Sequence, residues 1–180
     1  MNLSTMKTAL PGMIEWIETT KSVHRENSIP VSAFHLPHVA LYFPDEILNK
    51  VQIVTTDQLP IPPLSLLGMT ELADFEQADS RAITLDQMYF IKPSFADDEE
   101  IHFHELIHVL QWQILGKEKF LFIYGLGLLQ FGYSENPLEL MARRYTELCL
   151  LKKKNLPLIE SITTDLNRIS SEMVDEPLTI

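Results

Sequence analysis

The segment Ser94–Lys119 constrains the fold of this chain more than any other segment. Its sequence, SFADDEEIHFHELIHVLQWQILGKEK, predicts one helix with Ser94 or Asp97 as N-cap, an acidic first turn and Gly116 at its end. A helix that is apolar on nearly all sides must lie at the centre of a core. The apolar residues of this helix, which fall on all its sides, are Ile101, Phe103, Leu106, Ile107, Leu110, Trp112, Ile114 and Leu115.

Other segments predict further helices and a small sheet around this central helix. Lys50–Thr56 and Ala82–Pro93 contain β-branched or alternating apolar residues, and each predicts a strand. Residues 12–26, 120–131 and 134–155 predict helices, and the tail beyond them is only weakly amphipathic. The sequence therefore predicts the α+β class, as a mostly helical domain with a small β-sheet beside the central helix.

The length and composition suit one soluble domain. A chain of 180 residues can bury one sizeable core, so we expect a single domain over residues 1–180. We place its core at about 30–155 and a flexible tail at 173–180. Hydrophobic residues make up 46% and charged residues 22%, which is the usual balance of a soluble globular protein.

The net charge narrows the class of partner. The chain has 25 acidic and 14 basic residues, and its formal charge is −11. Nucleic-acid backbones and anionic membrane surfaces are themselves negative and would repel such a protein. We therefore expect neither nucleic acid nor a membrane as partner.

Cysteine usage and the apolar segments point to the cytoplasm. Cys149 is the single cysteine, so an intrachain disulfide cannot form, and we expect it to be a packed helix residue rather than a catalytic thiol. The N-terminal apolar run is broken by Pro11 and Gly12 and does not resemble a secretory signal. The apolar stretch Phe120–Phe131 is too short to span a bilayer.

The central helix carries a motif with metal-ligand spacing, His104-Glu105-Leu106-Ile107-His108. Residues four apart lie on the same face of a helix, so the two imidazoles can point at one tetrahedral zinc ion. Glu105 lies beside that face, where a general base can reach water. The alternative is a pair of core histidines that hydrogen-bond to carbonyls or carboxylates.

A catalytic zinc requires a third protein ligand, and several residues compete for that role. Glu139 is the favoured candidate, because it lies in the first turns of a second, partly apolar helix. Glu135 precedes that helix and is better suited to a cap or a solvated charge, and Glu147 ranks third. His102 points to another side of the central helix, whereas the upstream histidines stay open as candidates, namely His35 and His38.

These residues resemble a known family. HELIHVLQWQILG, then GY, then NPLELMA resemble small bacterial zincin-like proteins of the gluzincin type, over about residues 83–147. The resemblance implies a zincin-like domain and a zinc-dependent metallopeptidase in which His104, His108 and Glu139 bind Zn²⁺. It also implies that Glu105 activates the water and passes its proton to the leaving amine. A peptide could add as a strand at Ile83–Ile91, which would border the cleft.

One position departs from the family pattern. Thermolysin-like enzymes have an acidic residue four positions after the ligand glutamate, and here that position is Arg143. The carboxylate that orients a zinc histidine must then come from elsewhere, with Glu135 or Glu100 as candidates. The candidates for stabilising an oxyanion are Tyr133, Arg143, Arg144 and Tyr145.

Two alternatives to a metallopeptidase follow from the same residues. A zincin-like domain can bind zinc and have no catalytic activity, serving as a structural or interaction module. A helical protein without metal is the other alternative. Zinc content separates the metal-free alternative from the other two, and a Glu105→Gln variant separates an enzyme from an inactive zinc-binding domain.

Overall fold

The computed structural model describes residues 3–72, 80–151 and 155–175, and helix α4, Glu99–Leu115, lies among the other elements. Eleven of its residues, running from Ile101 to Trp112, are buried on every side of the helix. The prediction of a central helix is therefore confirmed. The fold is mostly helical with a small mixed sheet, so the predicted α+β class is confirmed as well.

The ends of α4 have identifiable causes. Asp98 is the N-cap, and its side chain accepts a hydrogen bond from the Glu100 N–H at 3.0 Å. The predicted caps Ser94 and Asp97 are wrong, because a short 3-10 turn precedes the helix and moves its start. Gly116 ends the helix with φ 75°, a left-handed conformation that favours glycine.

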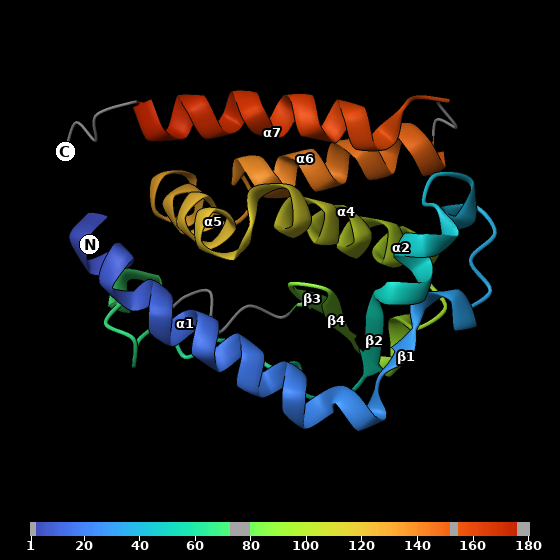
Figure 1. Ribbon diagram of the computed structural model, residues 1–180, viewed down its shortest axis with the longest axis horizontal. Helices are drawn as coiled ribbons and strands as arrows, with labels where there is room; N and C mark the ends of the chain where they lie inside the picture. Colours follow the sequence, from blue (N-terminus) through green and yellow to red (C-terminus); the bar gives the residue numbers. More distant parts are fainter. Residues whose placement is uncertain (1–2, 73–79, 152–154, 176–180) are drawn as a thin grey trace.

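The other helices surround α4. They are α1 (Leu3–His24), α2 (Asp45–Lys50), α5 (Lys117–Phe131), α6 (Pro137–Thr146) and α7 (Leu158–Asp175), with a π-helical turn at Glu147–Leu151. Figure 1 shows α7 along one side of the molecule and α1 along the other, with α4, α5 and α6 between them. Helix α4 contacts α5, α6 and α7, and α1 contacts α5. Helices α5, α6 and α7 therefore flank α4, and α1 joins this group through α5.

A four-stranded sheet packs beside α4. Its strands are β1 (Ile29–Pro30), β2 (Gln52–Thr55), β3 (Ala82–Leu85) and β4 (Met88–Ile91), in the order β1-β2-β4-β3. β2 and β4 are parallel, and the other two pairs are antiparallel. β3 is thus an edge strand of the sheet, and it contacts α4.

The predicted single strand Ala82–Pro93 is wrong, because it folds into a hairpin. Leu85 pairs with Met88, so only Asp86 and Gln87 form the turn. Asp86 has φ 62°, a conformation that aspartate tolerates better than most residues. A two-residue turn preserves the alternation of apolar side chains, which is why the pattern indicates one continuous strand. The strand predicted at Lys50–Thr56 is confirmed as β2.

Helix α1 is longer than the predicted segment 12–26. It begins at Leu3 and contains Pro11, which lies just before the predicted start of the helix. A proline removes one backbone hydrogen bond, but packing of an apolar face can outweigh that loss. Met6, Met13 and Ile17 supply this face, with exposed fractions of 1%, 6% and 1%.

The C-terminal region also forms a helix. In α7 the side chains of Leu158, Ile162 and Leu166 are four residues apart and buried, so they form one apolar face. The buried residues therefore extend on both sides of the range 30–155. Residues 176–180 of the expected tail lie outside the described residues. The predicted helix 134–155 is divided into α6 and the π-helical turn, and residues 152–154 also lie outside the described range.

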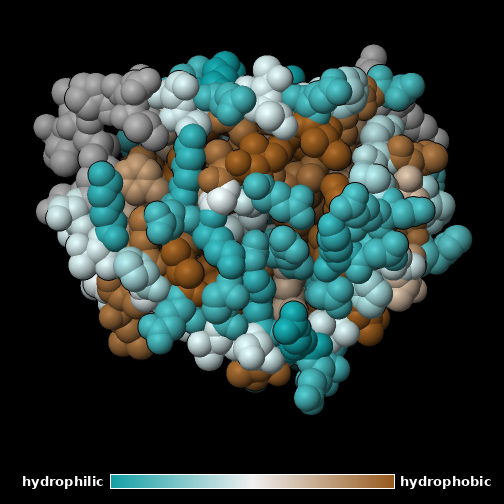
Figure 2. Space-filling view, viewed as in Figure 1, coloured by the Kyte–Doolittle hydropathy of each residue, from teal (hydrophilic) through white to brown (hydrophobic). Residues whose placement is uncertain are grey.

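The surface seen in Figure 2 carries mostly hydrophilic side chains, with hydrophobic residues in separate patches between them. The apolar helix α5 is partly covered by its neighbours, and Phe120, Ile123 and Leu126 are buried. None of the described helices combines the length and apolar character needed to cross a bilayer.

Candidate metal centre

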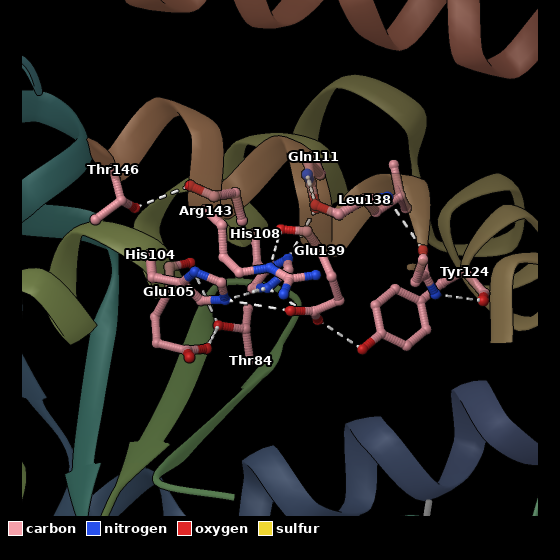
Figure 3. A network of polar contacts seen from close by, with 12 residues as sticks. Thr84, His104, Glu105, His108, Gln111, Tyr124, Leu138, Glu139, Arg143 and Thr146 are labelled. Carbon is pink, nitrogen blue, oxygen red and sulfur yellow. Dashed lines mark hydrogen bonds and ion pairs between the residues drawn. The ribbon is translucent and has the colours of Figure 1, made fainter. Parts of the chain in front are cut away.

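Three side chains from two helices meet beside the sheet. His104 and His108 lie one turn apart on the same face of α4, and α6 crosses that face with Glu139 in its first turn. The Asn136 side chain caps α6 by accepting a hydrogen bond from the Leu138 N–H at 3.0 Å. Pro137 suits the first helical position, since its missing N–H has no partner there anyway. This start of α6 places Glu139 opposite the two histidines (Figure 3).

The spacing of the three groups fits one metal ion. The Nε2 atoms of His104 and His108 are 3.0 Å apart. The Glu139 carboxylate oxygens lie 3.4 Å from His104 Nε2 and 3.3 Å from His108 Nε2. Ligands about 2.0–2.1 Å from a tetrahedral ion are separated by about 3.3 Å. His104 approaches Oε2 of Glu139 and His108 approaches Oε1, so the distances are close to those between ligands of one ion, and the three side chains together could hold a metal ion.

The same three groups are coupled electrostatically. Burial favours the neutral form of Glu139, but the charges and hydrogen bonds of His108 and His104 outweigh it and hold the pKa of Glu139 well below its ordinary value. Burial lowers the pKa of His108, but the carboxylate of Glu139 outweighs this effect and raises it to about 9. A buried carboxylate is thus kept ionised where a cation can be bound.

Two outer residues orient the ligands. Gln111 Oε1 lies 2.8 Å from His108 Nδ1, and the Gln111 amide donates to the Leu138 carbonyl at 2.9 Å. An amide oxygen only accepts, so Nδ1 of His108 carries a proton, and Nε2 points toward His104 and Glu139, where a metal ion could be held. The Tyr124 hydroxyl donates to the Glu139 carboxylate at 2.7 Å. Burial and the charge of Glu139 raise the pKa of Tyr124, so it remains a donor.

The predicted orienting carboxylates are not part of this arrangement. Glu135 and Glu100 are exposed, and neither belongs to the cluster of possible ligands. The neutral amide of Gln111 takes the place of a carboxylate at His108. The prediction of Glu135 or Glu100 in this role is therefore wrong, since both lie too close to solvent to be held against the histidines.

Helix α5 is tied to the site through a glycine. Asn136 Nδ2 donates to the Tyr124 carbonyl at 3.0 Å. A Cβ at Gly127 would lie 2.7 Å from Asn136 Oδ1, so only glycine lets this side chain reach α5. The contact fixes α5 against the start of α6, and with it the distance between Tyr124 and Glu139.

Glu105 lies beside the cluster of ligands without being part of it. Its side chain is 6% exposed, and its carboxylate accepts a hydrogen bond from the Thr84 hydroxyl at 2.6 Å. Thr84 belongs to β3, so the edge strand of the sheet holds the carboxylate in place (Figure 3). Glu105 thus lies near the three possible metal ligands without being one of them, an arrangement that is compatible with a general base.

Two pockets meet at this centre. The first is apolar and narrow, with a volume of about 110 Å³, and is lined by α1, α5 and β3 together with Glu105, His108 and Glu139. The second is more polar and wider, about 700 Å³, and is lined by His104, Glu105 and Arg143 among others. β3 contributes to both pockets, so the first half of the predicted strand Ile83–Ile91 borders the cleft.

The other histidines that the sequence analysis considers lie outside this cluster. His102 is fully buried on another side of α4, as predicted. His38 is exposed and its Nδ1 lies 2.5 Å from the Glu99 carboxylate, at the start of α4. His35 is exposed and belongs to no cluster of possible ligands in the described part of the chain. Glu147, the third-ranked ligand, is exposed in the π-helical turn and is also absent from the cluster.

The four candidates for oxyanion stabilisation divide into two pairs. Tyr133 lines both pockets and is 47% exposed, and the partial burial of its phenol together with the charge of Glu139 raises its pKa, so the phenol stays protonated. Arg143 lines the polar pocket and donates to the carbonyls of Glu139 and Ser134. Arg144 and Tyr145 instead bind Asp165 of α7 at 3.0 and 2.9 Å. They do not line either pocket.

Cys149 is a packing residue, as the sequence predicts. It is 1% exposed, and burial raises the pKa of its thiol to about 11. A thiol with such a pKa is not a thiolate near neutral pH, so it has neither the nucleophile nor the metal-ligand form.

Three residues of the site have no role in the sequence-based prediction. Gln111 lies three residues after His108, on the same helical face, and a glutamine on an all-round apolar helix could have indicated a partner for that histidine. Tyr124 carries a hydroxyl group on the apolar helix α5, which is a weaker indication of a polar partner. Thr84 could not be found, because the hairpin that brings it to Glu105 is not visible in the sequence.

Comparisons with protein-family models, with curated proteins and with solved structures found no match to this chain.

Proposed function

We propose that this protein is a zinc-dependent hydrolase of the zincin type that cleaves amide bonds, most simply a metallopeptidase. One observation carries the proposal: two histidines and a glutamate have the mutual distances of ligands to one tetrahedral ion, with a second buried glutamate beside them. Silent metal sites do not require that second carboxylate. Here Glu105 lines both pockets, where substrate and water have access.

Zinc is the ion that suits these ligands best. Two imidazoles and one carboxylate form a set found in catalytic zinc sites, and three protein ligands leave one tetrahedral position open. Calcium and magnesium prefer sets made of oxygen alone. Bound zinc would act as a Lewis acid that polarises a carbonyl and makes water more acidic.

The side chains of the site then have separate roles. Glu105 accepts a proton from the attacking water and delivers it to the leaving nitrogen. Thr84 fixes the orientation of that carboxylate, and its hydrogen bond leaves the second carboxylate oxygen for the proton. Tyr133, whose phenol stays protonated, is the donor best placed to stabilise the oxyanion.

Hydrolysis is tested with the Glu105→Gln variant and a broad peptide library. Because general-base catalysis contributes about 10²–10⁴-fold, we expect the variant to retain zinc and to lose at least about a hundredfold in rate. Glu118→Gln is the matched control, since Glu118 is exposed on α5 and outside both pockets. Equal inertness of the wild-type protein and Glu105→Gln would favour a zinc-binding module without catalysis.

A further inference from the structure

An apolar channel leads away from the metal centre between α1 and α5. Its lining on α1 runs from Met6 to Ile17, which corresponds to about 16 Å of helix at 1.5 Å per residue. Its lining on α5 includes Leu121, Gly125 and Leu128, so the two helices form opposite walls. This length exceeds that of any amino-acid side chain.

Thr84, Glu105 and Glu139 line the channel at the metal centre. Ser80 and Trp112, whose buried Nε1 has no hydrogen-bond partner in the described part of the chain, line it as well, whereas the α1 wall consists of aliphatic and aromatic side chains. A peptide lying along α1 would bring amide groups against these side chains, and unpaired buried amides are costly. An alkyl chain has no such groups, and the flexible thioethers of Met6 and Met13 can adapt to it.

The wider pocket, on the other side of the metal centre, is polar. The wider pocket contains Arg81, Glu100 and Arg143, so a polar group can lie there in contact with water. The narrow channel of about 110 Å³ accepts a single chain, and the pocket of about 700 Å³ accepts a larger polar group. The reacting centre lies between them, because Glu105 lines both.

We propose that the site acts on amphiphilic amides, with a long unbranched acyl chain in the apolar channel and a polar amine portion, such as an amino acid or peptide, in the wider pocket. This substrate class rests on the proposed hydrolase function. Water adds its oxygen to the acyl carbon and the carbon–nitrogen bond breaks. Glu105 moves one proton from water to the leaving nitrogen, so the products are a fatty acid and an amine.

Binding to the channel can be measured without turnover. Trp16 and Trp112 are the two tryptophans of the chain, and both line the channel, so intrinsic fluorescence reports its occupancy. The probes are acetate, octanoate and myristate below micelle-forming concentrations, added to zinc-loaded Glu105→Gln protein. Each buried methylene should tighten binding about threefold or more until the channel is filled. Equal response to acetate and octanoate would overturn the proposal.

Gly125 offers a way to block the channel. A Cβ at this position would already lie 3.1 Å from Met6 Cε, so Gly125→Leu must displace the flexible Met6 side chain, and both side chains then obstruct the channel. Replacement of a helical glycine by leucine favours the helix and so protects the fold. We expect Gly125→Leu to weaken octanoate binding at least about tenfold, the loss of two buried methylenes. Gln130→Leu, exposed on the same helix, is the matched control and should leave binding unchanged.

Hydrolysis of one dipeptide with an acetyl, octanoyl or myristoyl group at its N-terminus completes the test. In the wild-type protein we expect kcat/KM to rise with the length of the acyl chain. In the Gly125→Leu variant kcat/KM should no longer depend on that length. If no amide is cleaved but fatty acids still bind according to length, the hydrolase function fails while the channel assignment stands. If an unacylated peptide that contains phenylalanine binds the channel as tightly as octanoate does, the acyl-chain assignment is wrong.

Discussion

Two histidine environments on the same helix differ in what the imidazoles meet. His102 has both ring nitrogens occupied within the protein: Nε2 lies 2.7 Å from the Ala96 carbonyl, and Nδ1 lies 2.6 Å from the Tyr89 hydroxyl. His104 and His108 instead direct their Nε2 atoms toward each other and toward a carboxylate. All three histidines belong to α4, so helix position alone decides which environment each one enters.

The hydrogen bonds fix the protonation of each environment. A carbonyl only accepts, so Nε2 of His102 donates to Ala96 and Nδ1 accepts from Tyr89. Burial lowers the pKa of His102 and outweighs the nearby carboxylates, so this imidazole stays neutral. At His108 the same burial is overcome by Glu139. The comparison teaches that a buried histidine is available to an ion where one ring nitrogen faces other possible ligands, rather than a backbone carbonyl or a hydroxyl that occupies it.

The largest expected effect follows from removing a ligand. Glu139→Gln and His104→Ala should each weaken zinc binding by more than about a hundredfold, which is the upper end of what loss of an outer partner causes. Zinc at a hundred times its Kd stabilises a protein that binds it by about 2.7 kcal/mol, and this gain should vanish in both variants. Thermal unfolding with and without zinc measures it. His38→Ala, at an exposed histidine, should behave as wild type.

Replacement of His102 should have the opposite effects: the protein should lose stability and keep its zinc affinity. His102→Leu leaves the Tyr89 hydroxyl and the Ala96 carbonyl buried without their partner, at a cost of about 1–3 kcal/mol each. We expect a loss of about 2–5 kcal/mol in the free energy of unfolding, with zinc affinity unchanged. Denaturant unfolding and zinc titration provide the two readouts. A large fall in zinc affinity would show that His102 is not confined to a structural role.

Gln111 connects the two kinds of environment, because it holds a ligand in place without binding the ion. Gln111→Leu should lower zinc affinity about 10–100-fold, as loss of an outer hydrogen bond to a ligand histidine does. Gln113→Leu is the matched control, since Gln113 is exposed two residues further along α4. Competition with a chromophoric chelator measures both affinities. Equal affinity of the two variants would contradict the role assigned to Gln111.

The smallest effect is expected at Thr84. Thr84→Val keeps the shape of the side chain and removes the hydrogen bond to Glu105, a bond worth about 1.5–3 kcal/mol when the acceptor is charged. Zinc affinity should not change, whereas kcat should fall about tenfold and KM should stay constant. Steady-state kinetics on the wild-type and variant proteins measure both parameters. An unchanged kcat would indicate that Thr84 only packs against α4.

Local patterns in the sequence predict the centre of this molecule well. The apolar surround of α4 and the four-residue spacing of His104 and His108 depend only on helix geometry, and both are confirmed. Glu139 was inferred from its place early in a second helix, and α6 brings it to the two histidines. These features require a helix and its period, which the sequence shows directly.

The contacts between distant segments could not be predicted in the same way. Thr84 reaches Glu105 only because Asp86 turns the chain into a hairpin, and a continuous alternation hides that turn. The apolar channel is lined by Met6 and Leu10 of α1, yet the predicted helix begins only at residue 12, after Pro11. Both features depend on tertiary packing, and the periodicity of one segment does not show which other segment it packs against.

The most direct test is a crystal structure of the zinc-loaded protein with anomalous diffraction data at the zinc edge. We expect one ion per chain, about 2.0–2.2 Å from His104 Nε2, His108 Nε2 and a Glu139 carboxylate oxygen, with Glu105 outside the coordination sphere. An ion bound by other residues, or no anomalous signal between α4 and α6 after zinc loading, would contradict the assignment of this centre.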